Sequence, residues 1–182
     1  HSSITTCLNY LAKQGFRIDV VPSDDDGLVD LNELRRLITE QTILITIGAV
    51  NSETGILQNL KAISKVVRAN EKIIFHCDAT QALGKIELDF NDFDLASFSG
   101  HKIYGLKGIG GLVIRKNLSI TPLIHGGKSS SALRSGTPPT PLILSLRNAI
   151  SLALSDFETK EVKIKKVHDY LVEKLNSLEH VE

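Results

Sequence analysis

The fold class follows most directly from residues 72–102, KIIFHCDATQALGKIELDFNDFDLASFSGHK. Within residues 72–77 only Lys72 and His76 are polar, and residues 94–99 are a second strand candidate with the apolar residues Leu95, Ala96 and Phe98. Short apolar runs of this kind, rich in β-branched and aromatic residues, are typical of buried strands. Both segments lead into polar residues, so the sequence predicts two strands whose carboxyl ends carry functional side chains.

The flanking sequence continues an alternation of strands and helices. Apolar residues at helical spacing predict helices over residues 3–14, 31–38 and 59–70, the first closed by Gly15 and the second begun by Asp30 as N-cap. Strands are predicted over 17–22, 42–47 and 111–115, and 42–47 is apolar enough to be buried on both faces. Such alternation needs crossover connections, so we expect a three-layer α/β/α domain with a mostly parallel sheet.

The pattern changes after the proline-rich stretch at residues 137–141. From residue 142 to 154, and on to 178, apolar residues recur at helical spacing and no further strand is indicated. We expect residues 1–140 to form the sheet domain and residues 141–182 to lead towards a small second domain outside this chain. The sequence begins with His1 and contains no methionine, which predicts a fragment of a longer protein.

The composition argues against several classes of function. Lys and Arg together number 21, as do Asp and Glu, so no overall charge attracts nucleic acid or an anionic membrane. No apolar run approaches the roughly 20 residues of a membrane span, and the first residues do not form a signal peptide. Cys7 and Cys77 are far apart, which argues against a disulfide framework or a cysteine zinc site. The sequence therefore predicts a cytoplasmic protein.

Residues 97–111, SFSGHKIYGLKGIGG, place Ser99, His101 and Lys102 at the end of a predicted strand. Open α/β sheets bind their ligands at the carboxyl ends of the strands, and a lysine there can act as a nucleophile. The glycines alone are weak evidence for a phosphate-binding loop, because they precede a strand rather than open a helix. On these residues alone, a glycine-rich connection with surface lysines is an equally good interpretation.

Two other predicted strands also lead into polar residues. Asp78 follows the strand at 72–77, with Gln81 three positions later, and Asn51 comes shortly after the strand at 42–47. Taken singly, Asp78 is explained by a helix N-cap and Asn51 by an Asx turn. Because three successive strand ends offer such groups, we expect them to converge on one site.

Four segments resemble, in order, the motifs of the class V aminotransferase superfamily: VNSETG, HCDATQ, SFSGHKIYG and RSGTP, at residues 50–55, 76–81, 97–105 and 134–138. Their wording is most similar to the NifS/IscS-like cysteine desulfurases. The resemblance spans nearly the whole chain. It implies an incomplete fold type I large domain that binds pyridoxal 5'-phosphate (PLP).

The resemblance implies a role for each residue at the strand ends. Lys102 matches the lysine that forms a Schiff base with PLP, and Asp78 matches the carboxylate that pairs with the protonated pyridine nitrogen. Gln81 matches the donor to the phenolic oxygen, and Asn51 matches a second polar contact near that edge. His1 matches the histidine that stacks on the ring. Lys102, His1 and Asp78 are therefore the predicted catalytic residues.

Three further residues resemble contacts to the cofactor phosphate. Ser99 and His101 match side chains that donate to its oxygens. Thr137 matches a threonine that reaches the phosphate of the neighbouring subunit, which implies a homodimer with shared active sites. On sequence alone, Thr137 is explained equally well as a hydroxyl in the turn before Pro138.

Parts of the family pattern have no counterpart in this sequence. These are the upstream phosphate loop, the loop with the nucleophilic cysteine, and the arginine that binds the substrate carboxylate. Cys7 and Cys77 are better interpreted as packing residues than as sulfur carriers. Residues 126–131, GGKSSS, also depart from the usual wording before Arg134.

The resemblance predicts the PLP-binding core of a cysteine desulfurase, which converts L-cysteine to L-alanine and an enzyme-bound persulfide. A sulfur-acceptor scaffold protein would use that sulfur for iron-sulfur cluster or thio-cofactor synthesis. We expect this chain to be inactive alone. Two alternatives stay open: another class V enzyme, such as a selenocysteine lyase or an aminotransferase, and a non-catalytic α/β phosphate-binding module.

Overall fold

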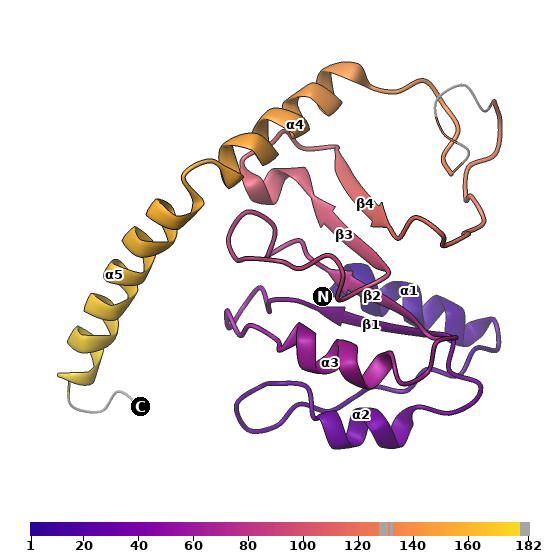
Figure 1. Ribbon diagram of the computed structural model, residues 1–182, viewed down its shortest axis with the longest axis horizontal. Helices are drawn as coiled ribbons and strands as arrows, with labels where there is room; N and C mark the ends of the chain where they lie inside the picture. Colours follow the sequence, from indigo (N-terminus) through magenta and orange to yellow (C-terminus); the bar gives the residue numbers. More distant parts are fainter. Residues whose placement is uncertain (128–130, 132, 179–182) are drawn as a thin grey trace.

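A computed structural model describes residues 1–127, 131 and 133–178, and within them one four-stranded sheet organises the chain (Figure 1). The strands lie in the order β1-β2-β3-β4. β1, β2 and β3 are mutually parallel, and β4 is antiparallel to β3, which confirms the predicted mostly parallel sheet. Their bounds are Leu44–Gly48 for β1, Ile74–Asp78 for β2, Leu95–Ser99 for β3 and Gly110–Ile114 for β4.

Helices lie on both sides of this sheet, which confirms the α/β class. Figure 1 shows α3 in front of β1, with α2 beside it, and α1 behind the sheet. The rear layer is thin, because α1 has no buried residue. The helices are α1 (Ser2–Lys13), α2 (Leu31–Leu37), α3 (Leu60–Val67), α4 (Thr140–Leu154) and α5 (Phe157–Asn176), with a 3-10 helix η1 at Gly100–Ile103.

Local signals in the sequence explain where the first helices begin and end. Asp30 caps α2 by accepting hydrogen bonds from the backbone N–H groups of Asn32 and Glu33, as its position before an apolar repeat predicts. Asn59 caps α3 by accepting one such hydrogen bond. Gly15 follows α1 with φ +93, a conformation that glycine adopts without steric cost.

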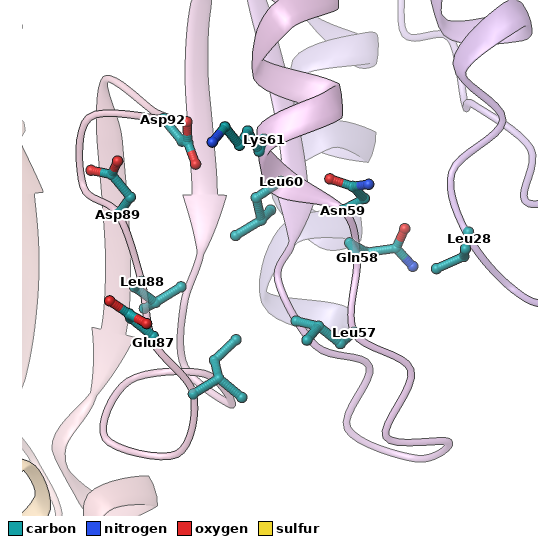
Figure 2. A pocket seen from close by; sticks show the side chains of 11 residues that line it. Leu28, Leu57, Gln58, Asn59, Leu60, Lys61, Glu87, Leu88, Asp89 and Asp92 are labelled. Carbon is teal, nitrogen blue, oxygen red and sulfur yellow. The ribbon is translucent and has the colours of Figure 1, made fainter. Parts of the chain in front are cut away.

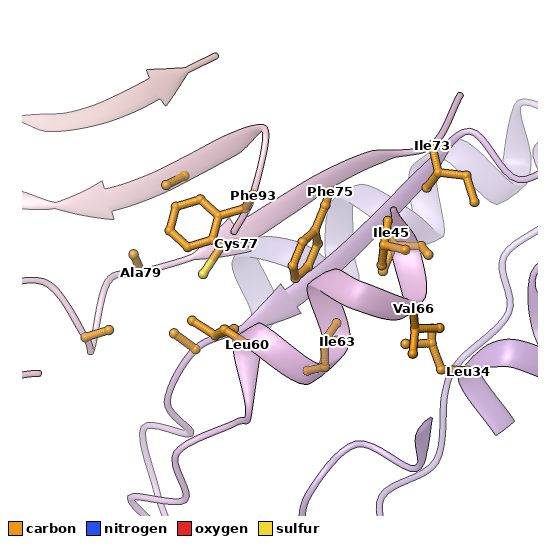
Figure 3. Close-up of a cluster of buried hydrophobic side chains, with 14 residues drawn as sticks. Leu34, Ile45, Leu60, Ile63, Val66, Ile73, Phe75, Cys77, Ala79 and Phe93 are labelled. Carbon is orange, nitrogen blue, oxygen red and sulfur yellow. The ribbon is translucent and has the colours of Figure 1, made fainter. Parts of the chain in front are cut away.

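The hydrophobic core lies between the sheet and α3. Phe75 and Cys77 project from β2 towards α3 (Figure 3), and both are almost fully buried, as are Ile63 and Val67 of α3. Phe75 also makes an edge-on contact with Phe93, with ring centroids 6.4 Å apart. Because side chains alternate along a strand, residues 74, 76 and 78 lie on the opposite face of β2. That face is the one free to carry polar groups.

A surface hollow of about 510 Å³ lies between the start of α3 and the connection from β2 to β3 (Figure 2). Asn59 and Lys61 border it on one side, and Glu87, Asp89 and Asp92 on the other. None of the predicted site residues lines this hollow.

Three expectations from the sequence are wrong in detail. Residues 17–22 form no strand, because only the isolated bridge between Ser23 and Val29 forms beside them. β1 is not buried on both faces: Leu44 is 42% exposed, whereas Ile45 on the opposite face is 8% exposed. The C-terminal helical segment is interrupted at residues 155–156, where Asp156 has φ +55.

Lys128 and the two serines after it, which belong to the divergent segment 126–131, lie outside the described residues. Among the residues that are described, no helix is both long enough and apolar enough to cross a membrane.

Candidate functional site

The sheet brings the three predicted polar strand ends to a single edge. Gly48 of β1 is paired in register with Asp78 of β2, and Asp78 is paired with Ser97 of β3. Two backbone hydrogen bonds extend this pairing past the strand ends: Ala49 N–H to Asp78 O at 2.9 Å, and Ala79 N–H to Ser97 O at 2.8 Å. The backbone ends of β1, β2 and β3 therefore lie side by side, as the sequence predicts.

Asp78 ends β2 and is partly buried. Its Oδ1 accepts a hydrogen bond from the backbone N–H of Thr80 at 3.0 Å. The residues that follow form turns, so this bond closes an Asx turn rather than capping a helix. No other hydrogen bond or ion pair to the carboxylate is present within the described part of the chain. Oδ2 can therefore accept from a ligand.

His76 lies on the same face of β2 as Asp78 and bridges all three parallel strands. Its Nδ1 is 2.7 Å from the hydroxyl of Thr46 on β1, and its Nε2 is 2.9 Å from the hydroxyl of Ser97 on β3. Burial lowers the pKa of His76, although the negative charge of Asp78 opposes this shift. A neutral imidazole therefore lies beside Asp78 and does not compete for its carboxylate as a cation.

The third strand end leads into η1, which carries the predicted lysine. Ser99 ends β3 and is half-buried, and its hydroxyl forms no cap for η1. The chain turns tightly after η1, and this turn needs glycine at position 105, because a Cβ on Gly105 would lie 2.8 Å from the carbonyl oxygen of Gly100. His101 and Lys102 are exposed on this turn, next to the edge where Asp78 ends.

Gln81 lies in the turn that follows Asp78 and binds a residue that the sequence analysis did not assign to the site. Nζ of Lys85 donates a hydrogen bond to its Oε1 at 2.8 Å. Burial lowers the pKa of Lys85, and the positive charge of Lys102 lowers it further. Lys85 is therefore close enough to Lys102 for their charges to interact, which places Gln81, Lys85 and Lys102 in one neighbourhood.

The structure does not join the remaining predicted residues to this cluster. His1 caps α1, where its Nδ1 accepts from the backbone N–H of Ser3. Asn51 is exposed, and its Oδ1 accepts from the N–H groups of Glu53 and Thr54, as in the Asx turn that was the alternative interpretation. Thr137 is exposed in the connection between β4 and α4. Their roles in cofactor binding stay predictions.

The two cysteines differ in their surroundings. Burial raises the pKa of Cys77 to about 12, so this thiol stays protonated in the core, in agreement with a packing role. Cys7 is exposed on α1 and does not pack, contrary to expectation, because α1 buries none of its residues.

Two further candidate residues, His76 and Lys85, were not predicted from the sequence, although the spacing of each from a predicted site residue could have indicated it. His76 precedes Asp78 by two residues, which places both on one face of a strand. Lys85 follows Gln81 by four residues, the spacing of neighbouring side chains in a helical turn.

Comparison with known proteins gives consistent matches. A family model described as Aminotransferase class-V matches residues 1–182. The cysteine desulfurase IscS of Rickettsia akari is 42% identical over 181 residues, which cover 97% of this chain and 44% of that protein.

Two solved structures are also similar. One described as "NIFS-LIKE PROTEIN" superposes with a TM-score of 0.91 at 37% identity, over 98% of this chain and 50% of that one. Another, "SspA in complex with cysteine", has a TM-score of 0.78 at 39% identity, over 83% of this chain and 44% of that one. The chain therefore spans about half the length of the relatives that it matches.

Proposed function

Because this chain belongs to the aminotransferase class-V family, whose members depend on PLP, we propose that it is the PLP-binding core of a cysteine desulfurase. The observation that carries the proposal is that β2, which ends at Asp78, and β3, which leads into the turn with Lys102, lie side by side at one sheet edge. This arrangement occurs in a chain 42% identical to an IscS over 97% of its length.

The residues at this edge suit PLP in chemical kind. PLP has a basic ring nitrogen, a phenolic oxygen and a phosphate. Asp78 offers the nitrogen a partly buried carboxylate, one oxygen of which has no partner among the described residues. Lys85 and Lys102 interact with each other, yet neither forms an ion pair with a carboxylate in the described ranges. An anionic ligand would offset their combined charge.

Each residue has a distinct task in this proposal. When bound, PLP supplies an electron sink for the negative charge that develops on the α-carbon of an amino-acid substrate. Asp78 stabilises the positive charge on the ring nitrogen, and the neutral His76 does not form an ion pair with that carboxylate. Lys102 holds the cofactor through Nζ and moves the proton at the substrate α-carbon. Gln81 donates to the phenolic oxygen, and Ser99 and His101 donate to the phosphate.

Asn51 would add a polar contact near the phenolic oxygen, and His1 would stack on the ring. Thr137 would bind the phosphate of a neighbouring subunit, which makes the protein a homodimer with shared sites. Residues 1–140 would then be the central part of the large domain, and residues 141–182 its connection to a small domain.

The overall reaction joins the sulfur of L-cysteine to an enzyme thiol and releases L-alanine. We place the nucleophilic thiol outside this chain, because Cys77 is buried and protonated and Cys7 belongs to α1, for which the family resemblance gives no sulfur-carrying role. Residues 1–182 alone would then be inactive. A cytoplasmic sulfur-acceptor scaffold protein would receive the persulfide sulfur for iron-sulfur cluster or thio-cofactor synthesis.

The test uses the full-length protein and its Lys102→Ala variant. Purified wild-type protein incubated with PLP should show the visible absorbance of lysine-bound cofactor, and borohydride reduction should leave a stable adduct on the peptide that contains Lys102. L-cysteine should yield alanine and sulfide in equal amounts with a reductant present. Adduct formation on another lysine would refute the assignment, and transamination or selenocysteine-specific turnover would point to another class V activity.

A further inference from the structure

The turn at residues 80–85 is packed tightly against two other elements. Gly84 has φ +72, and a Cβ added there would lie 2.6 Å from the Cβ of Ala153 on α4 and 3.7 Å from Cγ2 of Ile103 in η1. A small buried cluster joins the same three elements. The turn, η1 and α4 therefore meet at one point, and Lys85 extends from the turn at that point.

The hydrogen bond from Lys85 determines which way the Gln81 amide faces. An ammonium group only donates, so the amide atom 2.8 Å from Nζ must be the carbonyl oxygen. The NH₂ group of Gln81 then faces away from Lys85, and it forms no hydrogen bond with the described residues. Lys85 thereby leaves Gln81 with a donor to offer, which is what the phenolic oxygen of PLP requires.

Lys85 also adds a charge at this edge. Burial lowers the pKa of Lys85, and repulsion from Lys102 lowers it further; the turn that carries Lys85 also packs on η1, which carries Lys102. Asp78 and His101 are the other ionisable groups at the ends of β2 and in η1, and α4 contributes only the exposed Arg147. Lys85 is therefore the second cation beside the lysine that is to hold the cofactor.

We propose that Lys85 is a positioning residue for the cofactor site, which orients the amide of Gln81 and adds a positive charge beside Lys102. This inference rests on the proposed function. It does not make Lys85 a residue that touches substrate. Its effect reaches the cofactor through Gln81 and through the electrostatic field at Lys102.

Both effects act in the same direction on the pH midpoint of the lysine-bound cofactor chromophore. A nearby cation disfavours the protonated chromophore, and so does a hydrogen bond donated to the phenolate. Replacing Lys85 with methionine should therefore raise the midpoint. We expect a rise of about 0.5–1 unit, at the low end of the usual range for a neighbouring charge because Lys85 is solvent-exposed.

The experiment compares four variants of the full-length protein with the wild type, by absorbance titration and by the dissociation constant for PLP. Lys85→Met should raise the midpoint and weaken PLP binding about five- to tenfold. Lys85→Arg keeps the charge and the donor, and should stay within about 0.2 unit of wild type. Lys85→Gln keeps a donor without the charge, and should lie between them. Lys61→Met removes a lysine from α3, away from the site, and should change nothing.

The outcomes separate this inference from the proposed function. A wild-type protein with no chromophore would contradict the proposed function itself. A chromophore whose midpoint is the same in Lys85→Met, Lys85→Gln and Lys61→Met would overturn the role of Lys85 and leave the function standing. An equal shift in Lys85→Arg would also overturn it, since that variant retains the charge. If Lys85→Met does not fold, as judged by circular dichroism, the Lys85→Gln and Lys85→Arg pair decides.

Discussion

Gly84→Ala is expected to destabilise the protein strongly, because two independent penalties combine at this position. Gly84 has φ +72, where a residue with a Cβ atom costs about 1–2 kcal/mol. The added methyl group would also lie 2.6 Å from the Cβ of Ala153, far inside contact distance. Neither atom can rotate away, because both are bonded directly to the backbone. Overpacking of this kind costs about 1–3 kcal/mol, so the total is about 2–5 kcal/mol.

A double-mutant cycle with Ala153→Gly separates the two penalties. Without the methyl group of Ala153, the nearest neighbours would be Ile103 Cγ2 at 3.7 Å and the Cα of residue 153 at 3.8 Å, which are ordinary contacts. Ala153→Gly alone should cost about 1 kcal/mol, the usual effect of glycine inside a helix. The double variant should then be more stable than the sum of the single effects by about 1–3 kcal/mol.

The assay is urea-induced unfolding followed by circular dichroism, with Gly15→Ala as the matched control. Gly15 has φ +93 and nothing within 4 Å of an added Cβ, so this variant should show the backbone penalty alone. Two results would refute the reasoning: additive effects in the cycle, or a loss in Gly84→Ala no greater than in Gly15→Ala.

Three further predictions concern other described residues. Because burial raises the pKa of Cys77 to about 12, a thiol reagent at pH 8 should label Cys7 in the native protein and Cys77 only after unfolding; rapid native labelling of Cys77 would contradict the packing. Burial lowers the pKa of His76, so below about pH 6.5 the unfolded chain binds a proton that the folded chain does not. The free energy of unfolding should therefore fall as pH decreases from about 7 to 5, and fall less in His76→Gln; parallel pH profiles in urea titrations would disprove this. Asp94 accepts hydrogen bonds from the backbone N–H of Phe75 at 2.9 Å and pairs with Nε of Arg115 at 2.8 Å. Asp94→Ala should cost about 2–3 kcal/mol, with Asn91→Ala, which leaves both contacts in place, as the control in the same unfolding assay.

The strand ends could be predicted from sequence because two signals coincide there. Residues 73–77 are apolar except for His76, and Asp78 ends the run, which marks both the strand and the edge that carries polar groups. Residues 17–22 carry a similar local pattern, but a strand needs a partner to pair with, and pairing is not a local property. The expectation that β1 is buried on both faces was wrong for a related reason. The composition of a strand does not show which elements cover each of its faces.

The residues of the candidate site also fall into two groups, those predicted from sequence motifs and those identified only from tertiary contacts. Asp78, Gln81 and Lys102 were predicted because each resembles a motif residue at a strand end. His76 sits inside an apolar run, and its value depends on hydroxyl groups contributed by Thr46 and Ser97, which are 30 and 21 positions away in sequence. Lys85 can be assigned to the site only once the structure shows that η1, with Lys102, lies close to it. The sequence does not show that proximity.

The break between α4 and α5 makes the last helix a lever arm. α5 has 20 residues, no buried residue, and extends away from the sheet in Figure 1. At about 1.5 Å per residue it is roughly 30 Å long. A change of about 10° in the backbone at Asp156 would carry the far end of α5 through about 5 Å, while α4 and η1 stay in contact. The orientation of α5 thus depends on the backbone dihedral angles of two residues, Ser155 in an extended conformation and Asp156 at positive φ.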